Sequence, residues 1–244
     1  MLISVPVLSR VFGVRPNGVL HVGAHEAEEA ALYSAHEWGP VTWVEMLPEK
    51  FAQLKARFAN DSNNSVLQAA CWDTDGAVVP LFEASNGQSS SLLAPREHLT
   101  EHPSISFAEN GTMTTSRLDS ILPPSARFDF ITFDIQGAEL RALRGLGDRL
   151  LDVKWAFLEV NTKAMYDGCA IVSDIDEFMK EAGFVRVLTQ MAGDKGWGDA
   201  LYVKTRMLTR SELRWLSIKA RAWSAFMSMR RVARKPRLIV DYLR

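Results

Sequence analysis

Two short apolar runs in the first part of the chain constrain the fold more than any other feature of the sequence. Residues 19–26 read Val-Leu-His-Val-Gly-Ala-His-Glu, and residues 41–45 read Val-Thr-Trp-Val-Glu. This order of strand, tight turn, helix and second strand is typical of a mononucleotide-binding unit. In such a unit the ligand approaches the backbone at the first turn, and an acid after the second strand accepts ribose hydroxyls. The two runs therefore predict an α/β fold that binds an adenosine-type cofactor.

The turn between these strands favours a cationic cofactor over a dinucleotide. A dinucleotide fingerprint places three glycines around a pyrophosphate, whereas this turn has Gly23 followed by Glu26, Glu28 and Glu29. These carboxylates repel a pyrophosphate and attract a sulfonium. The turn predicts S-adenosylmethionine, with Gly23 allowing close approach and Glu45 binding the ribose. An ordinary βαβ turn with an acidic helix start, which the helix dipole favours, is the alternative.

The composition fits one α/β domain with appendages. The chain has 244 residues, of which 47% are hydrophobic, so it is long enough to bury a full core. Its two cysteines, Cys71 and Cys169, are too few for a disulfide framework or a Cys-based zinc site, and the spacing of the histidines gives no zinc site. No signal-peptide pattern or membrane-spanning run is present. These features predict a cytoplasmic protein in a reducing compartment.

Charge divides the chain into two parts. Residues 206–244 contain eleven Lys or Arg and two acidic residues, a charge of +9, whereas residues 1–205 sum to −10. We therefore expect a domain over residues 1–205 and a basic extension over residues 206–244. Apolar residues recur in the extension at steps of three and four, which predicts an amphipathic helix. Its predicted apolar stripe consists of Trp215, Ile218, Ala222, Phe226 and Met229.

The sequence is consistent with three binding surfaces for this extension. The helix is expected to lie on an anionic membrane at its inner face, to join another subunit, or to pack on the acidic body of its own chain. Nucleic acid is disfavoured, because the acidic body repels a phosphate backbone.

The remaining apolar runs predict a doubly wound, seven-stranded, mostly parallel sheet with an antiparallel hairpin at its edge. Strands over 78–82 and 112–117 enclose a loop rich in Ser, Asn and Gly. We expect this loop to form part of an acceptor pocket, the alternative being a mobile surface loop. We expect helices over 48–58, 138–146 and 173–182, and strands over 65–71, 127–134, 155–160, 184–190 and 199–204.

The segment Asp-Ile-Gln-Gly-Ala-Glu at residues 134–139 makes a family resemblance specific. Over residues 17–204 the chain resembles the FkbM family of S-adenosylmethionine-dependent methyltransferases. The resemblance implies a class I methyltransferase fold and O-methylation of sugar hydroxyls on glycolipids, polysaccharides or secondary metabolites. The chain has Ala27 where many members have glycine. The other segments that carry the resemblance, in the same order, are residues 20–29, 43–48, 158–161, 166–168 and 198–202.

Methyl transfer to a hydroxyl requires alignment of the oxygen with the methyl carbon and removal of the hydroxyl proton. Asp134 is the first catalytic candidate, as the base or as a ligand of a divalent cation that lowers the pKa of the hydroxyl. Glu159 is its candidate partner, and Glu139 is expected to cap or clamp the turn. Alternatively, Asp134 binds the cofactor or backbone amides, and Glu159 pairs with a nearby Arg or Lys.

The candidate binding residues follow the strands of the predicted sheet. Trp72 offers a stacking surface for adenine, unless it packs in the core, and Gln136 bonds a sugar hydroxyl or stabilises its turn. We expect His21 to be an interior histidine. The candidate acceptor-binding residues are Ser89, Ser90, Gln136, Asn161 and Tyr166. The candidate cofactor-binding residues are Gly23, Ala24, His25, Glu45, Met46, Cys71, Trp72 and Asp134.

Taken with these residues, the resemblance implies an O-methyltransferase that uses S-adenosylmethionine and acts on a sugar hydroxyl of a surface glycan or glycolipid. One alternative is an enzyme that methylates a small metabolite. The other is a non-catalytic scaffold that retains the fold and joins a glycan-assembly complex through the extension.

Overall fold

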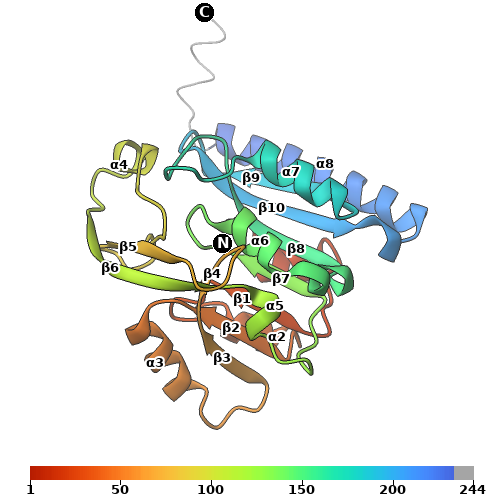
Figure 1. Cartoon of the computed structure of the whole chain (residues 1–244). Helices are drawn as coiled ribbons and strands as arrows, with labels where there is room; N and C mark the ends of the chain where they lie inside the picture. The colour runs from red at the N-terminus through yellow and green to blue at the C-terminus, as the bar shows by residue number, and fades with distance from the viewer. Residues whose placement is uncertain (234–244) are drawn as a thin grey trace, which may run out of the picture.

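A sheet of seven strands forms the centre of the molecule (Figure 1). The computed structural model describes residues 1–233, and side chains up to residue 229. The first five strands in spatial order run parallel, and β10 runs antiparallel to both β8 and β9. This arrangement confirms the predicted fold class. The order across the sheet is β3 (Asn64–Gln68), β2 (Val41–Glu45), β1 (Val19–Val22), β7 (Phe130–Phe133), β8 (Trp155–Asn161), β10 (Trp197–Lys204) and β9 (Phe184–Met191).

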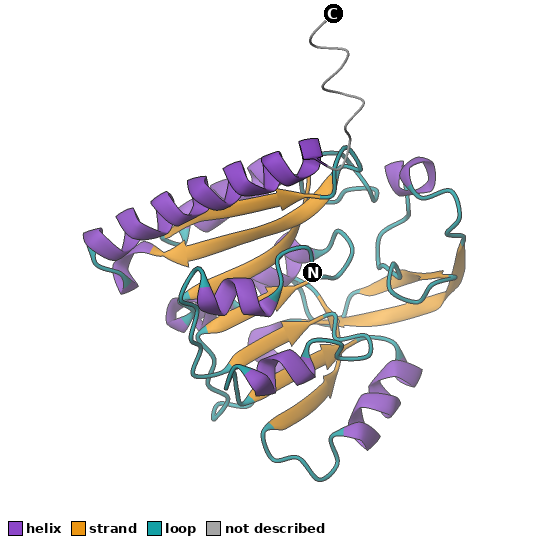
Figure 2. Ribbon diagram, turned by 180° about the vertical axis from the view of Figure 1, so that it is seen from behind, coloured by secondary structure: helices purple, strands orange, loops and turns teal. Residues whose placement is uncertain are grey.

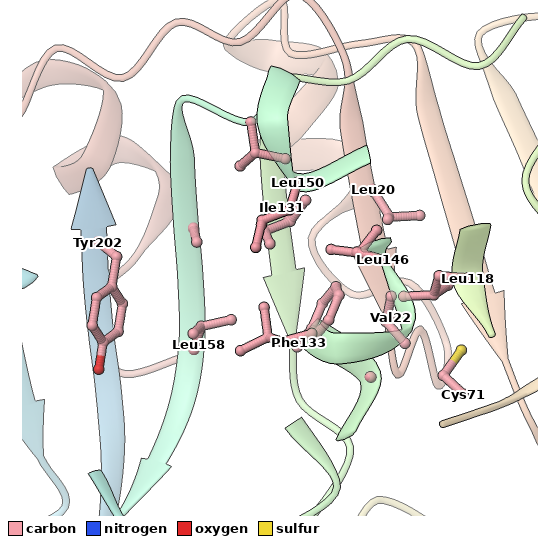
Figure 3. Close-up of a cluster of buried hydrophobic side chains, with 14 of the residues drawn as sticks. Leu20, Val22, Cys71, Leu118, Ile131, Phe133, Leu146, Leu150, Leu158 and Tyr202 are labelled. Atoms are coloured by element: carbon pink, nitrogen blue, oxygen red, sulfur yellow. The ribbon is translucent and has the colours of Figure 1, made fainter. Parts of the chain in front are cut away.

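Helices cover both faces of this sheet because its strands are apolar on both sides. On one face, Leu20 and Val22 pack with Ile131 and Phe133 (Figure 3). The elements over that face are α5 (Leu118–Ile121), α6 (Glu139–Gly145), the 3-10 helix η1 (Gly147–Asp152) and α7 (Val172–Glu181).

The opposite face is richer in aromatic side chains. Val19, Trp43 and Phe130 point to this side, where Trp43 stacks on Phe58. Because successive strand residues alternate between the faces, the runs that begin at Val19 and Phe130 supply both cores. The helices on this side are α1 (Val5–Arg10), α2 (Ala30–Ala35), α3 (Pro48–Arg57) and α8 (Arg210–Ala233).

A three-stranded sheet interrupts the α/β pattern after β3. It consists of β4 (Ala70–Cys71), β6 (Phe107–Ser116) and β5 (Val78–Ala84), and α4 (Glu97–Glu101) lies between β5 and β6 in the chain. The single strand expected over 65–71 was wrong. The chain leaves the main sheet at Ala69, whose N–H still donates to the Glu45 carbonyl, and the next two residues pair with β6 instead.

The helix α8 runs along the aromatic face beside β9 (Figure 2). Its contact with the body is made by Leu216 and Ala220, which are buried, and not by the predicted stripe. All five stripe residues are exposed instead, namely Trp215, Ile218, Ala222, Phe226 and Met229. Among the described helices, none is long and apolar enough to cross a membrane. The basic side chains from Arg230 onward lie outside the description.

Candidate functional site

Two adjoining cavities lie at the carboxyl edge of the parallel strands, where ligands bind in open α/β sheets. The larger has a volume of about 410 Å³ and is lined by residues that follow β1 and β7 and by residues of β8 and β10. The smaller, of about 50 Å³, lies over the ends of β1 and β2. Both cavities are lined by Gly23, His25, Gln88 and Asp134. A reacting group of one ligand can therefore meet the other ligand beside Asp134.

Close contact between β1 and β7 requires a glycine at position 23. Gly23 has φ of +86°, and a Cβ atom there would lie 1.9 Å from the backbone oxygen of Asp134. From the sequence, we expect a glycine here because a ligand approaches the backbone closely. The structure adds a second reason, which is the close approach of β1 and β7 to each other. The same glycine therefore fixes where Asp134 stands relative to the turn.

Glu45 holds the turn in shape. Its Oε2 accepts a hydrogen bond from the His25 N–H at 2.7 Å, and its Oε1 accepts one from the Leu47 N–H at 2.8 Å. Burial raises the pKa of this carboxyl above its usual value. His25 and Ala27 both have positive φ, 46° and 53°, so the bonds to Glu45 stabilise a strained turn. Each carboxylate oxygen keeps a second lone pair, which leaves Glu45 able to accept ribose hydroxyls.

Gln136 joins the two acids of the larger cavity. Its Nε2 donates to Oδ1 of Asp134 at 2.7 Å and to Oε2 of Glu159 at 3.0 Å. The Tyr166 hydroxyl donates to Oε1 of Gln136 at 2.7 Å. Burial, followed by the negative charge of Asp134, raises the pKa of Glu159 well above its usual value. The raised pKa favours the carboxylic acid form of Glu159, which can donate a hydrogen bond, over the carboxylate.

Glu139 lies behind the turn that follows β7 and lines neither cavity. Its Oε1 accepts hydrogen bonds from the N–H groups of Ile135 and Gly137, at 3.0 Å and 3.1 Å. The side chain is 1% exposed, and burial raises its pKa. This geometry fits a clamp on the turn that follows β7 and keeps Glu139 away from an acceptor.

Most of the predicted cofactor-binding residues line the smaller cavity. Burial raises the pKa of the Cys71 thiol to about 12, so this residue acts as an apolar wall. The structure does not bring Ala24 or Trp72 to the cavity. Ala24 is buried in the aromatic-face core, and Trp72 packs beside Leu47 beneath the guanidinium of Arg141. The residues that do line the cavity are Gly23, His25, Glu45, Met46, Cys71 and Asp134.

The predicted acceptor residues divide between the cavities. Ser90 lines the smaller one, where its hydroxyl donates to the Gly87 carbonyl at 2.9 Å. Ser91 Oγ donates to the Gln136 carbonyl at 2.7 Å, so this Ser-rich loop is bonded to the site. The residues in the larger cavity are Ser89, Gln136, Asn161 and Tyr166.

Asn161 is the residue of the larger cavity best prepared to bind a ligand. It is 1% exposed, and its Oδ1 and Nδ2 have no hydrogen-bond partner among the described residues. A buried amide without partners costs free energy, which a ligand bonded to both atoms offsets. Asn161 ends β8, on the same strand as Glu159.

Sequence reasoning missed three titratable side chains in the lining of the larger cavity. Asp199 is on β10, where burial raises its pKa to about 6. The other two are His98, on α4, and His102, directly after it, which are four residues apart and were not predicted to form part of a site. Burial lowers the pKa of His98 to about 4, so this ring is neutral. The described residues contain no group of three or more His, Cys, Asp or Glu arranged to hold a metal ion.

The larger cavity is acidic. Its described lining contains no Lys or Arg. The negative potential of such a wall disfavours phosphate and carboxylate ligands and favours neutral or cationic ones. The carboxyl groups that line it are Glu28, Glu29, Asp134 and Asp199, together with Glu159, whose raised pKa favours the neutral form.

Comparison with known proteins supplies related sequences. The family model described as the methyltransferase FkbM domain matches residues 21–186, which begin within β1 and end within β9. The 2-O-methyltransferase NoeI of Sinorhizobium fredii is 22% identical over 161 residues, which are 62% of this chain and 65% of NoeI. The match thus spans slightly less than two thirds of that relative.

Two solved structures align with this chain at low sequence identity. Methyltransferase FkbM from Methylobacillus flagellatus matches with a TM-score of 0.49 and 15% identity, over 76% of this chain and 43% of that chain. A protein of the NADB-Rossmann superfamily from Streptococcus agalactiae matches with a TM-score of 0.48 and 16% identity, over 85% of this chain and 72% of that chain.

Proposed function

We propose that this chain, which belongs to the FkbM methyltransferase family, transfers a methyl group from S-adenosylmethionine to a sugar hydroxyl of a surface glycan or glycolipid. The observation that carries the proposal is the junction of two cavities at Asp134, one shaped by the cofactor turn and the other lined by hydrogen-bonding side chains. A methyl donor in the first cavity and a hydroxyl in the second would meet there.

The smaller cavity fits the nucleoside part of the cofactor. Glu45 accepts the ribose hydroxyls with the lone pairs that its two backbone bonds leave. Met46, Cys71 and Leu92 supply apolar contact for the base. When bound, the cofactor supplies an electrophilic methyl group on a sulfonium, and the nearby carboxylate of Glu28 favours that positive charge.

The larger cavity fits a neutral acceptor rich in hydroxyl groups. Gln136 occupies Oδ1 of Asp134, which leaves Oδ2 to accept the proton of the reacting hydroxyl. Glu159, whose raised pKa favours the protonated form, donates to a sugar oxygen, while the amide of Asn161 offers both a donor and an acceptor. The NoeI relative is named for 2-O-methylation, which is the same class of reaction.

Calorimetry tests the cofactor part of the proposal. We expect the purified chain to bind S-adenosylmethionine and S-adenosylhomocysteine in the micromolar range, and Glu45→Ala to abolish binding. Because Glu45 also holds the turn, Glu45→Gln is measured beside it, with circular dichroism as the test of folding. Glu49→Ala removes an exposed carboxyl from α3 and serves as the matched control. No binding to either ligand would support a non-catalytic scaffold.

Transfer of a labelled methyl group tests the acceptor. Neutral glycans, glycolipids, uronic acids, sugar phosphates and small hydroxylated metabolites are supplied separately with the cofactor. We expect methylation of neutral sugars and loss of activity when the same sugar carries a phosphate or a carboxylate. Faster methylation of the anionic acceptors contradicts the assignment of the acidic cavity, and activity on small metabolites alone supports the other enzymatic alternative.

A further inference from the structure

The helix α8 has two apolar faces. One face packs on the body, where Leu216 and Ala220 are buried in the same cluster as Leu188 of β9. The other face points away from the body and carries Trp215 and Met229, which are 62% and 64% exposed. A helix needs one apolar face to pack on a sheet, so the second face has no role within the described fold.

Basic side chains border this outer face on both sides. At 3.6 residues per turn, Arg214 and Arg221 lie along one edge of the strip formed by Trp215, Ile218 and Met229, and Lys219 lies along the other. All three basic residues are exposed. Long basic side chains beside an apolar strip can place their alkyl stems on it and extend their charges beyond it.

The single acidic residue of α8 is used at the beginning of the helix. Oε2 of Glu212 accepts hydrogen bonds from the Thr209 N–H at 2.7 Å and from the Thr209 hydroxyl at 2.8 Å. The rest of the helix therefore presents an outer surface that is apolar and positively charged. Over residues 206–244 the sequence charge is +9, from eleven basic and two acidic residues.

We propose that the outer face of α8 binds to an anionic lipid surface, with the helix axis parallel to that surface. A tryptophan and aliphatic side chains with basic residues on both flanks are the features of helices that lie in a membrane interface. The strip is one helix wide and suits a lipid surface, whereas a stable interface between proteins buries about 800 Å² on each partner.

The position of α8 connects this docking to the candidate site. Its C-terminal end lies on the side of the molecule that carries α4, and residues 98 and 102 there line the larger cavity (Figures 1 and 2). Trp197, at the beginning of β10, lines the same cavity. A lipid-linked sugar on the membrane that contacts the outer face of α8 would thus lie near the acceptor cavity. This link rests on the proposed function, whereas lipid binding by α8 does not.

Vesicle flotation of the full chain tests the proposal. We expect the chain to float with vesicles of phosphatidylcholine and phosphatidylglycerol, to float weakly with phosphatidylcholine alone, and to be released by high salt. Trp215→Ser with Ile218→Ser should lower the partition coefficient about tenfold or more. Val78→Ser, which removes a 68% exposed apolar side chain from β5, should leave it unchanged.

Charge variants provide a second comparison. Arg214→Gln and Arg221→Gln should each lower binding to the anionic vesicles roughly fivefold. Arg144→Gln, at an exposed position on α6, is the matched control and should bind as the unaltered chain does. Equal binding to both kinds of vesicle, or no effect of the Trp215 and Ile218 substitutions, would overturn the proposal.

Two further measurements separate the remaining outcomes. A dimer in sedimentation equilibrium without vesicles, lost on Trp215→Ser with Ile218→Ser, would assign the face to a second copy and overturn lipid docking. Circular dichroism on the same samples confirms that the variants are folded, and calorimetry with S-adenosylmethionine tests the proposed function separately. A chain that floats but binds no cofactor would retain lipid docking while the proposed function fails.

Discussion

The two cavities that meet at Asp134 are built in different ways. The cofactor side consists of turns after neighbouring strands, held by backbone contacts such as the approach of Gly23 to Asp134. The acceptor side brings together distant segments: the Ser-rich loop, α4, β8 and β10. Side chains connect it, as where Gln136 contacts Asp134, Glu159 and Tyr166.

This difference separates what the fold requires from what the site can vary. The cofactor side cannot change without disturbing the central strands, because its geometry is the geometry of β1 and β7. The acceptor side depends on hydrogen bonds between side chains that the central sheet does not need in order to form. Substitutions there alter recognition of the acceptor at a smaller cost in stability. Substitutions in the two regions should therefore differ in kind, with folding affected on one side and ionisation and turnover on the other.

The largest effect is expected for Asp134→Asn, at the junction of the two sides. The amide cannot accept the hydroxyl proton, so kcat should fall by roughly 10²- to 10⁴-fold, about 3–5 kcal/mol in activation free energy. The Kd for S-adenosylmethionine should change little. Asp148→Asn, at an exposed position, is the control. Unchanged turnover with intact cofactor binding would remove Asp134 as the base.

Gly23→Ala should have the largest effect on folding. The new methyl group would overlap the Asp134 carbonyl, and φ of +86° adds strain, so we expect a loss of about 3 kcal/mol or more in the free energy of unfolding. Gly111→Ala isolates the strain, because φ is +79° there and a Cβ atom has open space. That control should lose about 1–2 kcal/mol. Equal losses in urea denaturation would contradict a packing role for Gly23.

The cofactor side is also the part of the site that could be predicted from the sequence. Gly23, Glu45 and Asp134 were identified because parallel strands place their carboxyl ends at one edge of the sheet. Trp72 was misplaced because the chain leaves the sheet at Ala69, a change of partner that β-strand patterns do not encode. Asp199 was missed because β10 is antiparallel, so the beginning of this strand reaches the cavity.

On the acceptor side, Glu159→Gln tests whether Glu159 carries a proton in the folded chain, through the effect of the substitution on stability. Burial raises the pKa of Glu159 in the folded chain, so the folded state binds a proton that the unfolded state releases above pH of about 4.5. The unaltered chain should therefore lose stability as pH rises from there toward the folded pKa.

The side chain of the Glu159→Gln variant stays neutral at every pH. Its free energy of unfolding should therefore rise relative to that of the unaltered chain, by up to about 1.4 kcal/mol per pH unit in that window. Thermal unfolding at a series of pH values measures the difference in stability between the variant and the unaltered chain, with Glu181→Gln as an exposed control. If the difference in stability is the same at every pH, Glu159 is ionised in the folded chain.

The smallest effect is expected for Ala27→Gly, within the cofactor turn. Ala27 has φ of 53° and is fully buried, so glycine relieves left-handed strain but removes a buried methyl group and adds freedom to the unfolded chain. These terms nearly cancel, and the free energy of unfolding should change by less than about 1 kcal/mol. Calorimetry adds the sharper comparison. If Glu45 already sets the turn through His25 and Leu47, the Kd for S-adenosylmethionine should stay within about threefold of the original value, equivalent to roughly 0.6 kcal/mol. A much tighter Kd for the glycine variant would show that the alanine restrains the cofactor side and that its backbone frame is adjustable after all.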